Sequence, residues 1–297
     1  MLTIFSTPKP FTDPHINLIQ RNAIQSWLHL GDDVDVILIG EEEGLDDVAA
    51  ELGVSVLHDV ARNRWGTPLV SSIFSLARKN SDTPLLAYVN ADILLMPDFV
   101  TVARQVASQA EKFLVVGQRW DLDVTEELDF GPGWATDLRE DVHARGGLHA
   151  PGGSDYFIFP RNIFTHIPDF AIGRAGWDNW MIYHALQQGW PVVDATSDLI
   201  IVHQNHDYAH LPEGQMHYDL EETSINAELG GGMRNMYWVL DASHELKHGK
   251  LRPARPRLAR LLRRLERWVQ PEEQQGLRWA LTRRLRHLRR RVVQDAD

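Results

Sequence analysis

The sequence contains no cysteine. This absence excludes disulfide bonds, thiolate nucleophiles and cysteine-ligated zinc sites, and it fits a reducing compartment. Any bound metal ion must therefore be held by oxygen and imidazole ligands.

Long apolar runs are missing as well. No stretch approaches the roughly 18 uncharged apolar residues of a membrane-spanning helix, and the N-terminus, MLTIFSTPKPF, lacks the basic start and apolar run of a signal peptide. Hydrophobic residues nevertheless make up 43% of the 297 positions. That is enough for a globular, enzyme-sized protein, which we expect to be cytoplasmic, with peripheral attachment to the inner face of the membrane as an option.

Charge is distributed unevenly along the chain. The formal net charge is -11, yet residues 247–297 hold 16 of the 30 lysines and arginines and only 5 of the 41 acidic residues. This segment therefore carries +11 and residues 1–246 carry -22. We expect a globular domain over 1–246 and a basic amphipathic helical extension over 247–297.

Two apolar stripes at helical spacing cross the basic extension, with arginines on the opposite faces. They are Leu258, Leu261, Leu262, Leu265 and Trp268, then Leu277, Leu281, Leu285, Leu288 and Val292. The two helices can pack on the acidic body or on another subunit. Alternatively, residues 251–293 can lie on an anionic membrane surface. We expect no nucleic acid partner, since the acidic remainder would repel phosphates.

Strand-like and helix-like segments alternate through residues 1–120, which favours an α/β fold with a mostly parallel sheet covered on both faces. We expect one strand over Pro84–Leu95, with Asn90 and Asp92 where its apolar first half runs out. Ligands of such sheets bind at the carboxyl ends of the strands. Asn90 and Asp92 are therefore candidate site residues, although both residue types also favour plain turns.

The alternation breaks after Asp121. Residues 129–153 contain six glycines and two prolines, which predicts a long surface loop near the site. We expect a strand over 154–160, a helix over 177–189, a strand over 198–203 and a second loop-rich stretch over 203–232.

The stretch VNADILLMPDF resembles the Asp-X-Asp region of GT-A glycosyltransferases, which transfer sugars from nucleotide-diphosphate donors. Asn90 stands where such enzymes often have the first aspartate, and Asp92 takes the second position. The resemblance implies that Asp92 binds the divalent ion that bridges the two phosphates of the donor, either Mn²⁺ or Mg²⁺. Such ions suit a site with one or two protein carboxylates.

Three later stretches extend the resemblance. GGSDYFIFPR implies a carboxylate beside the donor sugar or the acceptor, at Asp155. GWDNW resembles the acidic motif of inverting members and implies a general base at Asp178; a helix-dipole role for this residue is the alternative. IIVHQNHDY offers His203 and His206, one of which would be the last protein ligand of the metal.

The resemblance also implies that the first strand and its loop, with Thr7 and Lys9, hold the nucleoside. Lys9, Arg64 and Arg119 are candidate partners of the diphosphate, and the alternative for each is an exposed surface position. The Gly-rich segments 129–153 and 210–232 would close over the donor.

We therefore predict a GT-A, Rossmann-like, metal-dependent glycosyltransferase of inverting mechanism. Its donor would be a UDP- or GDP-sugar, and its acceptor a glycan, a lipid-linked molecule or a small molecule. The rival hypotheses are a sugar nucleotidyltransferase and a non-catalytic sugar- or nucleotide-binding protein. Sugar nucleotidyltransferases usually have a Gly-rich loop near the N-terminus, and FSTPKPF has no glycine, which argues against the first rival. Asn90, which stands in place of an aspartate, favours the second.

Overall fold

A nine-stranded sheet forms the centre of the protein in the computed structural model, which describes residues 1–206, 220–271 and 275–294. The strand order is β13-β12-β10-β6-β9-β4-β1-β2-β3. The strands are β1 Leu2–Ser6, β2 Val34–Ile39, β3 Ser55–Leu57, β4 Leu85–Val89, β6 Leu114–Val116, β9 Tyr156–Pro160, β10 Val192–Asp194, β12 His244–Lys247 and β13 Lys250–Pro253. Most pairs are parallel, while β9 runs antiparallel to both β4 and β6 and β13 runs antiparallel to β12.

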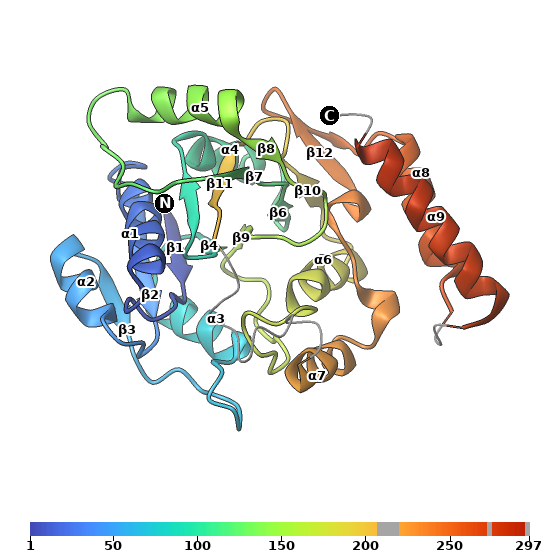
Figure 1. Ribbon diagram of the computed structural model, residues 1–297, viewed down its shortest axis with the longest axis horizontal. Helices are drawn as coiled ribbons and strands as arrows, with labels where there is room; N and C mark the ends of the chain where they lie inside the picture. The colour runs from blue at the N-terminus through green and yellow to red at the C-terminus, as the bar shows by residue number, and fades with distance from the viewer. Residues whose placement is uncertain (207–219, 272–274, 295–297) are drawn as a thin grey trace.

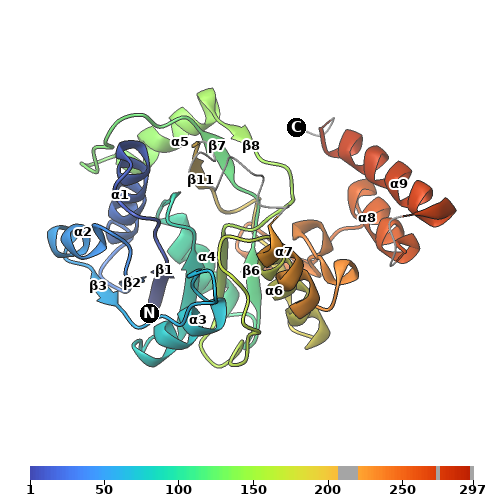
Figure 2. The same ribbon diagram turned by 60° about the horizontal axis from the view of Figure 1, so that its bottom comes forward.

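Helices cover both faces of this sheet, as the prediction required (Figures 1 and 2). Successive side chains of a strand point to opposite faces, so Leu2 and Ile4 join one hydrophobic cluster and Phe5 joins the other. The first cluster includes side chains from α1, α2 and α4, and the second includes side chains from α3 and α6. The bounds of these helices are α1 Pro14–Leu28, α2 Leu45–Leu52, α3 Val70–Lys79, α4 Asp98–Ala107 and α6 Trp177–Gln187.

A second, four-stranded sheet corrects one predicted strand. Its order is β5-β11-β7-β8, and its strands are β5 Ile93–Leu95, β7 Trp120–Leu122, β8 Gly147–Leu148 and β11 Ile201–Gln204. The expected single strand over Pro84–Leu95 is wrong, because it breaks into β4 and β5 at residues 90–92. Buried apolar residues lie on both sides of the break, so Asn90 and Asp92 could be taken as the polar end of one strand rather than as a turn between two.

The predicted loop over residues 129–153 is also wrong. It contains the helix α5 Trp134–Arg145 and the strand β8. Only Leu138 and Val142 of α5 are buried, and Gly133 in a left-handed conformation precedes it without a side-chain cap, so the sequence carries no strong helix signal there. In the second predicted loop, α7 covers Glu221–Leu229, and residues 207–219 lie outside the described residues.

The basic extension begins inside the large sheet. The expected boundary between residues 246 and 247 falls within β12, and the sheet continues to Pro253 in β13. The short helices η3 Met233–Asn235 and η4 Val239–Asp241 precede it, and α8 Leu258–Val269 and α9 Gly276–Gln294 follow. Both views place α8 and α9 at one end of the molecule (Figures 1 and 2). In the described ranges, no helix is long and apolar enough to cross a membrane.

Candidate active site

The turn at residues 90–92 connects the two sheets and positions the central carboxylate. Strand β4 ends at Val89, and the N–H of Ile93 then donates to the carbonyl oxygen of Asn90 at 3.1 Å, which reverses the chain into β5. The carbonyl oxygen of Asp92 accepts from the backbone N–H of Gln204 at 3.2 Å. Since Gln204 ends β11, this bond places Asp92 beside the residues that follow that strand.

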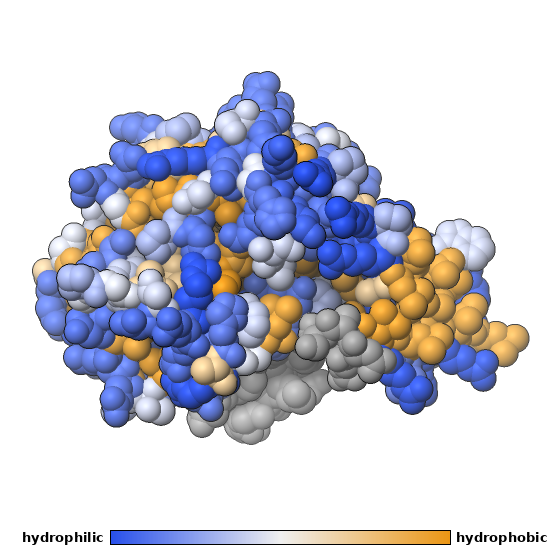
Figure 3. Space-filling view, turned by 90° about the horizontal axis from the view of Figure 1, so that it is seen from above, coloured by the Kyte–Doolittle hydropathy of each residue, from blue (hydrophilic) through white to orange (hydrophobic). Residues whose placement is uncertain are grey.

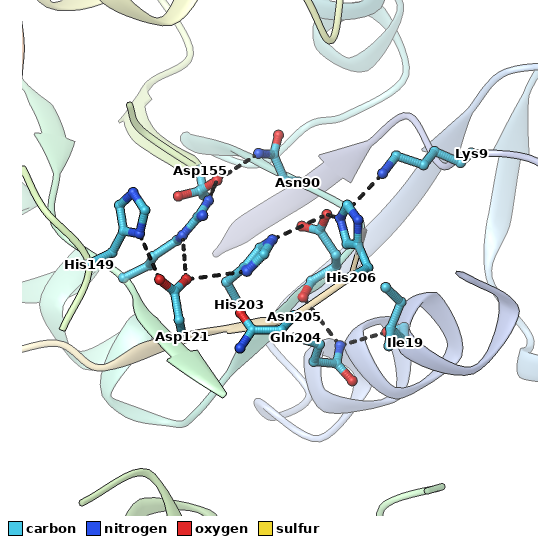
Figure 4. A network of polar contacts seen from close by, with 12 residues as sticks. Lys9, Ile19, Asn90, Asp121, His149, Asp155, His203, Gln204, Asn205 and His206 are labelled. Carbon is cyan, nitrogen blue, oxygen red and sulfur yellow. Dashed lines mark hydrogen bonds and ion pairs between the residues drawn. The ribbon is translucent and has the colours of Figure 1, made fainter. Parts of the chain in front are cut away.

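Asp92, His203 and His206 form a cluster in which each offers one ligand atom, and these atoms all lie within 4.8 Å of one another (Figure 4). Nε2 of His206 lies 3.1 Å from Oδ2 of Asp92, and Nε2 of His203 lies 3.9 Å from the same oxygen. The side chains of both histidines are at most 12% exposed. One carboxylate and two imidazoles, held this close, form a set that suits a divalent transition metal.

The electrostatics of Asp92 favour its charged form. Burial alone would raise the pKa of this carboxyl group. The hydrogen bond with His206 and the charges of His203 and Lys9 together outweigh burial, so the pKa of Asp92 lies well below the usual range. Its other oxygen, Oδ1, is buried without a hydrogen-bond partner among the described residues. A buried carboxylate oxygen with no partner is costly, and a bound cation would satisfy it. The cluster therefore fits a metal ion.

Lys9 completes this side of the site. Its Nζ lies 3.4 Å from Nε2 of His206, and burial is the main reason that the pKa of Lys9 is lowered, against the opposing effect of Asp92. The backbone N–H of Lys9 donates to Oε1 of the buried Gln20 at 2.6 Å, which fixes the loop after β1. Lys9 thus presents its amine beside the cluster, where an anionic group of a ligand could bind it.

A second group of polar side chains lies beside the cluster of Asp92, His203 and His206 (Figure 4). Nδ1 of His203 lies 3.3 Å from Oδ1 of Asp121, and Nδ1 of His149 lies 2.6 Å from Oδ2 of the same carboxylate. Arg119 bridges this carboxylate to Asp155, with Nε 2.9 Å from Asp121 and Nη1 2.8 Å from Asp155. Burial opposes the ionised form of Asp121, but the hydrogen bonds with His149 and His203 and the charge of Arg119 lower its pKa far below the ordinary range.

Asn90 belongs to this second group. Its Nδ2 donates to Oδ1 of Asp155 at 3.0 Å, and its backbone N–H donates to the carbonyl oxygen of Asp155 at 2.8 Å. The antiparallel pairing of β4 with β9, in which Val89 faces Tyr156, brings the two residues together. The amide N–H of Asn90 therefore holds Asp155 in place, a role the sequence did not suggest.

Asp178 lies at the start of α6. The helix is anchored by Trp177, whose ring packs edge-on against Tyr88 of β4 with the centroids 5.1 Å apart. Burial is the main reason that the pKa of Asp178 rises to about 6, although it accepts backbone hydrogen bonds, and the charge of Asp155 adds to the rise. A carboxyl group with this pKa can exchange a proton near neutral pH.

The remaining predicted residues lie in different places. Thr7 directly follows β1, whose Phe5 pairs with Tyr88, so it sits at the same sheet edge as Asn90, and its buried Oγ1 has no partner among the described residues. Arg64 is not brought into the network: its side chain is 66% exposed, and its guanidinium pairs with Glu221 of α7 at 2.5 Å. Of the predicted residues, Lys9, Asn90, Asp92, Arg119, Asp155, His203 and His206 belong to one connected polar network.

Sequence reasoning missed Asp121 and His149. Asp121 belongs to β7, at the point where the predicted alternation of strands and helices breaks, and β7 pairs in parallel with β11 so that Asp121 faces His203. The one available signal was the polar pair of Asp121 and Asp123 after an apolar strand.

No protein-family model matches the chain, and no curated protein matches it. Among solved structures, the chain is similar to glucosyl-3-phosphoglycerate synthase from Mycobacterium tuberculosis in complex with Mn²⁺, UDP-glucose and phosphoglyceric acid. The TM-score is 0.49 and the identity 14%, over 78% of this chain and 80% of that chain. The complex of that enzyme with Mg²⁺ and UDP gives the same four values. Its complex with Mn²⁺, UDP and glucosyl-3-phosphoglycerate gives a TM-score of 0.48 and 15% identity, over 78% and 80%. We infer the chemistry of this chain from its own side chains.

Proposed function

We propose that the protein is a nucleotide-sugar-dependent glycosyltransferase that uses a divalent metal ion. The observation that carries the proposal is the cluster of Asp92, His203 and His206 at the ends of β4 and β11, with a buried carboxylate oxygen that no described residue satisfies. Its place at the carboxyl ends of strands is where open α/β sheets bind ligands. The motif resemblance described above supports the same activity.

Asp92, His203 and His206 would hold Mn²⁺ or Mg²⁺. When bound, such an ion would neutralise the negative charge that the diphosphate gains as it leaves the sugar. Lys9 would contact the same diphosphate, because its amine lies beside His206 and within reach of the charge of Asp92. A fixed cation at the leaving group stabilises developing charge without reorganisation.

Asp178 would act as the general base of an inverting transfer. Its pKa of about 6 leaves it mostly ionised at neutral pH and basic enough to take a proton from an acceptor hydroxyl. Asp155 would orient hydroxyl groups of the sugar, since the amide of Asn90 and the guanidinium of Arg119 fix one of its oxygens, Oδ1. The acceptor would be a glycan, a lipid-linked molecule or a small molecule.

The experiment is a donor panel. The purified chain is incubated with UDP- and GDP-sugars with and without Mn²⁺, and release of the nucleoside diphosphate is measured. We expect turnover of at least one donor that requires the metal and is lost in Asp92→Ala. Asp32→Ala, at an exposed aspartate before β2, is the matched control and should keep the wild-type rate.

Two results would contradict the proposal. Formation of a nucleoside triphosphate from a nucleotide sugar and pyrophosphate would show a nucleotidyltransferase. Absence of turnover with every donor, together with nucleotide binding, would favour the non-catalytic alternative.

A further inference from the structure

The helix pair of α8 and α9 is attached to the body through its arginines. Arg260 is 5% exposed, and its Nη2 lies 2.7 Å from Oδ2 of Asp194 at the end of β10. Its Nη1 donates to the carbonyl oxygens of residues 240 and 242 at 3.1 Å each. Arg263, 3% exposed, lies 3.0 Å from Asp241 of η4, and its guanidinium lies over the ring of Trp238. The polar face of α8 is therefore turned inward.

Glu266 is the one acidic residue in the sequence of α8 and α9, and it is fully buried. Its carboxylate lies 2.9 Å from Arg286 and 2.9 Å from Arg289 of α9, and 3.6 Å from Arg263. The only negative charge of the helix pair is thus used internally. No carboxylate of these two helices faces the solvent.

The outward face is apolar. Seven large hydrophobic side chains of the pair are exposed, with Trp268 at 79% and Leu277 at 91%. They are Leu258, Leu261, Leu265, Trp268, Leu277, Leu281 and Leu288. Figure 3 shows this face as a continuous apolar area over the end of the molecule, bordered by hydrophilic residues. An exposed apolar area of this kind marks an interaction surface.

Six exposed arginines accompany this apolar face, and none of them forms an ion pair with a described residue. They are Arg264, Arg278, Arg283, Arg284, Arg290 and Arg291. Along α9, Arg283, Arg284, Arg286 and Arg290 line an open hollow of about 840 Å³ together with His287, Ala280 and Leu288. Arginine clusters of this kind bind phosphate groups.

We infer that this face of α8 and α9 binds the surface of an anionic phospholipid bilayer. Leucines and a tryptophan beside unpaired arginines match the acyl boundary and the phosphate headgroups of such a surface. A second copy of this chain fits the face less well. Two such faces in contact would bring twelve exposed arginines together with no carboxylate of these helices to pair with them. The body offers no apolar counterpart either, since its exposed large hydrophobic residues among the described ones are only Leu28, Trp65, Leu229 and Met233.

The test is co-sedimentation of the full chain with vesicles. Vesicles of phosphatidylcholine alone are compared with vesicles that contain about one third phosphatidylglycerol, which supplies the negative surface potential. We expect binding to the anionic vesicles only, and weaker binding as salt is raised. Arg283→Gln with Arg284→Gln should weaken binding about 30-fold, from about 1 kcal/mol for each basic side chain near the surface. Lys79→Gln with Lys112→Gln, at two exposed positions of the body, is the charge-matched control and should bind like wild type.

A second pair of variants separates lipid binding from self-association. Trp268→Ser should reduce vesicle binding, whereas Leu28→Ser, at an exposed leucine of α1, should not. Sedimentation velocity of the same proteins gives their oligomeric state. A wild-type chain that ignores anionic vesicles overturns the inference, and so does a dimer that Trp268→Ser dissociates without any vesicle binding by the wild type. Equal binding to both vesicle types would overturn the role of the arginines.

Discussion

Replacing Asp178 by asparagine should stabilise the protein while removing its activity. Burial raises the pKa of Asp178 from an ordinary 3.8 to about 6. The ionised side chain at pH 7 then costs up to about 3 kcal/mol of the free energy of unfolding, at about 1.4 kcal/mol for each pKa unit. Part of the side chain reaches solvent, so we expect Asp178→Asn to raise the free energy of unfolding at pH 7 by about 1 to 3 kcal/mol.

The pH dependence has a definite sign. The folded state holds the proton of Asp178 more tightly than the unfolded chain does, so wild-type stability falls as the pH rises from about 4 to about 6. Asparagine does not titrate, so the advantage of Asp178→Asn should be complete at pH 7 and about 1 kcal/mol smaller at pH 5. Urea unfolding of both proteins at the two pH values measures the difference, with Asp32→Asn as the exposed control.

Transfer activity gives the second readout. Since the base must be ionised, the wild-type rate should fall about tenfold between pH 7 and pH 5, and Asp178→Asn should be nearly inactive at both. The reasoning would be refuted by a variant that is less stable than wild type at pH 7, or by one that transfers sugar at the wild-type rate.

Asp121→Asn should lower Mn²⁺ affinity by about 10- to 100-fold in a spin-resonance titration, because the carboxylate that orients His203 loses its charge; unchanged affinity would contradict this. Lys9→Met should raise KM for the nucleotide sugar more than it lowers kcat, as steady-state kinetics would show; a change in kcat alone would argue against diphosphate contact. Arg263→Met should lower the free energy of unfolding by about 3 kcal/mol in urea, because Asp241 is 1% exposed and loses a partner. The more exposed Arg267→Met is its control, and equal losses would disprove the ranking.

The sheet could be predicted because its strands and helices have their own periodicity. Leu85–Val89 is apolar throughout because it is buried on both faces, and α3 and α4 each show a clear apolar stripe. Helix α5 could not be predicted, since it buries only Leu138 and Val142. The break between β4 and β5 was hidden because each side of it enters a different sheet, and both sides are buried.

The candidate ligands could be named from the sequence, but the residues that contact and orient them could not. Asp92 stands where the apolar half of its predicted strand runs out, and His203 and His206 lie at and just after the end of another, which is a local signal. The contact of Asp121 with His203 depends on the parallel pairing of β7 with β11 across about 80 residues, and no local spacing encodes that register. The inward orientation of the α8 arginines was equally hidden, because an amphipathic pattern does not say which of its two faces meets the body.

The arginines of α8 pair with carboxylates of the globular domain, and these ion pairs join the C-terminal helices and that domain into one folding unit. Asp194 and Asp241 precede residue 246 in the sequence, whereas their guanidinium partners, Arg260 and Arg263, follow residue 257. Removal of the C-terminal helices would therefore leave the buried carboxylate of Asp241 and the partly buried carboxylate of Asp194 without their guanidinium partners. A shortened chain should then unfold at lower temperature, because the arginines that neutralise these carboxylates belong to the basic segment.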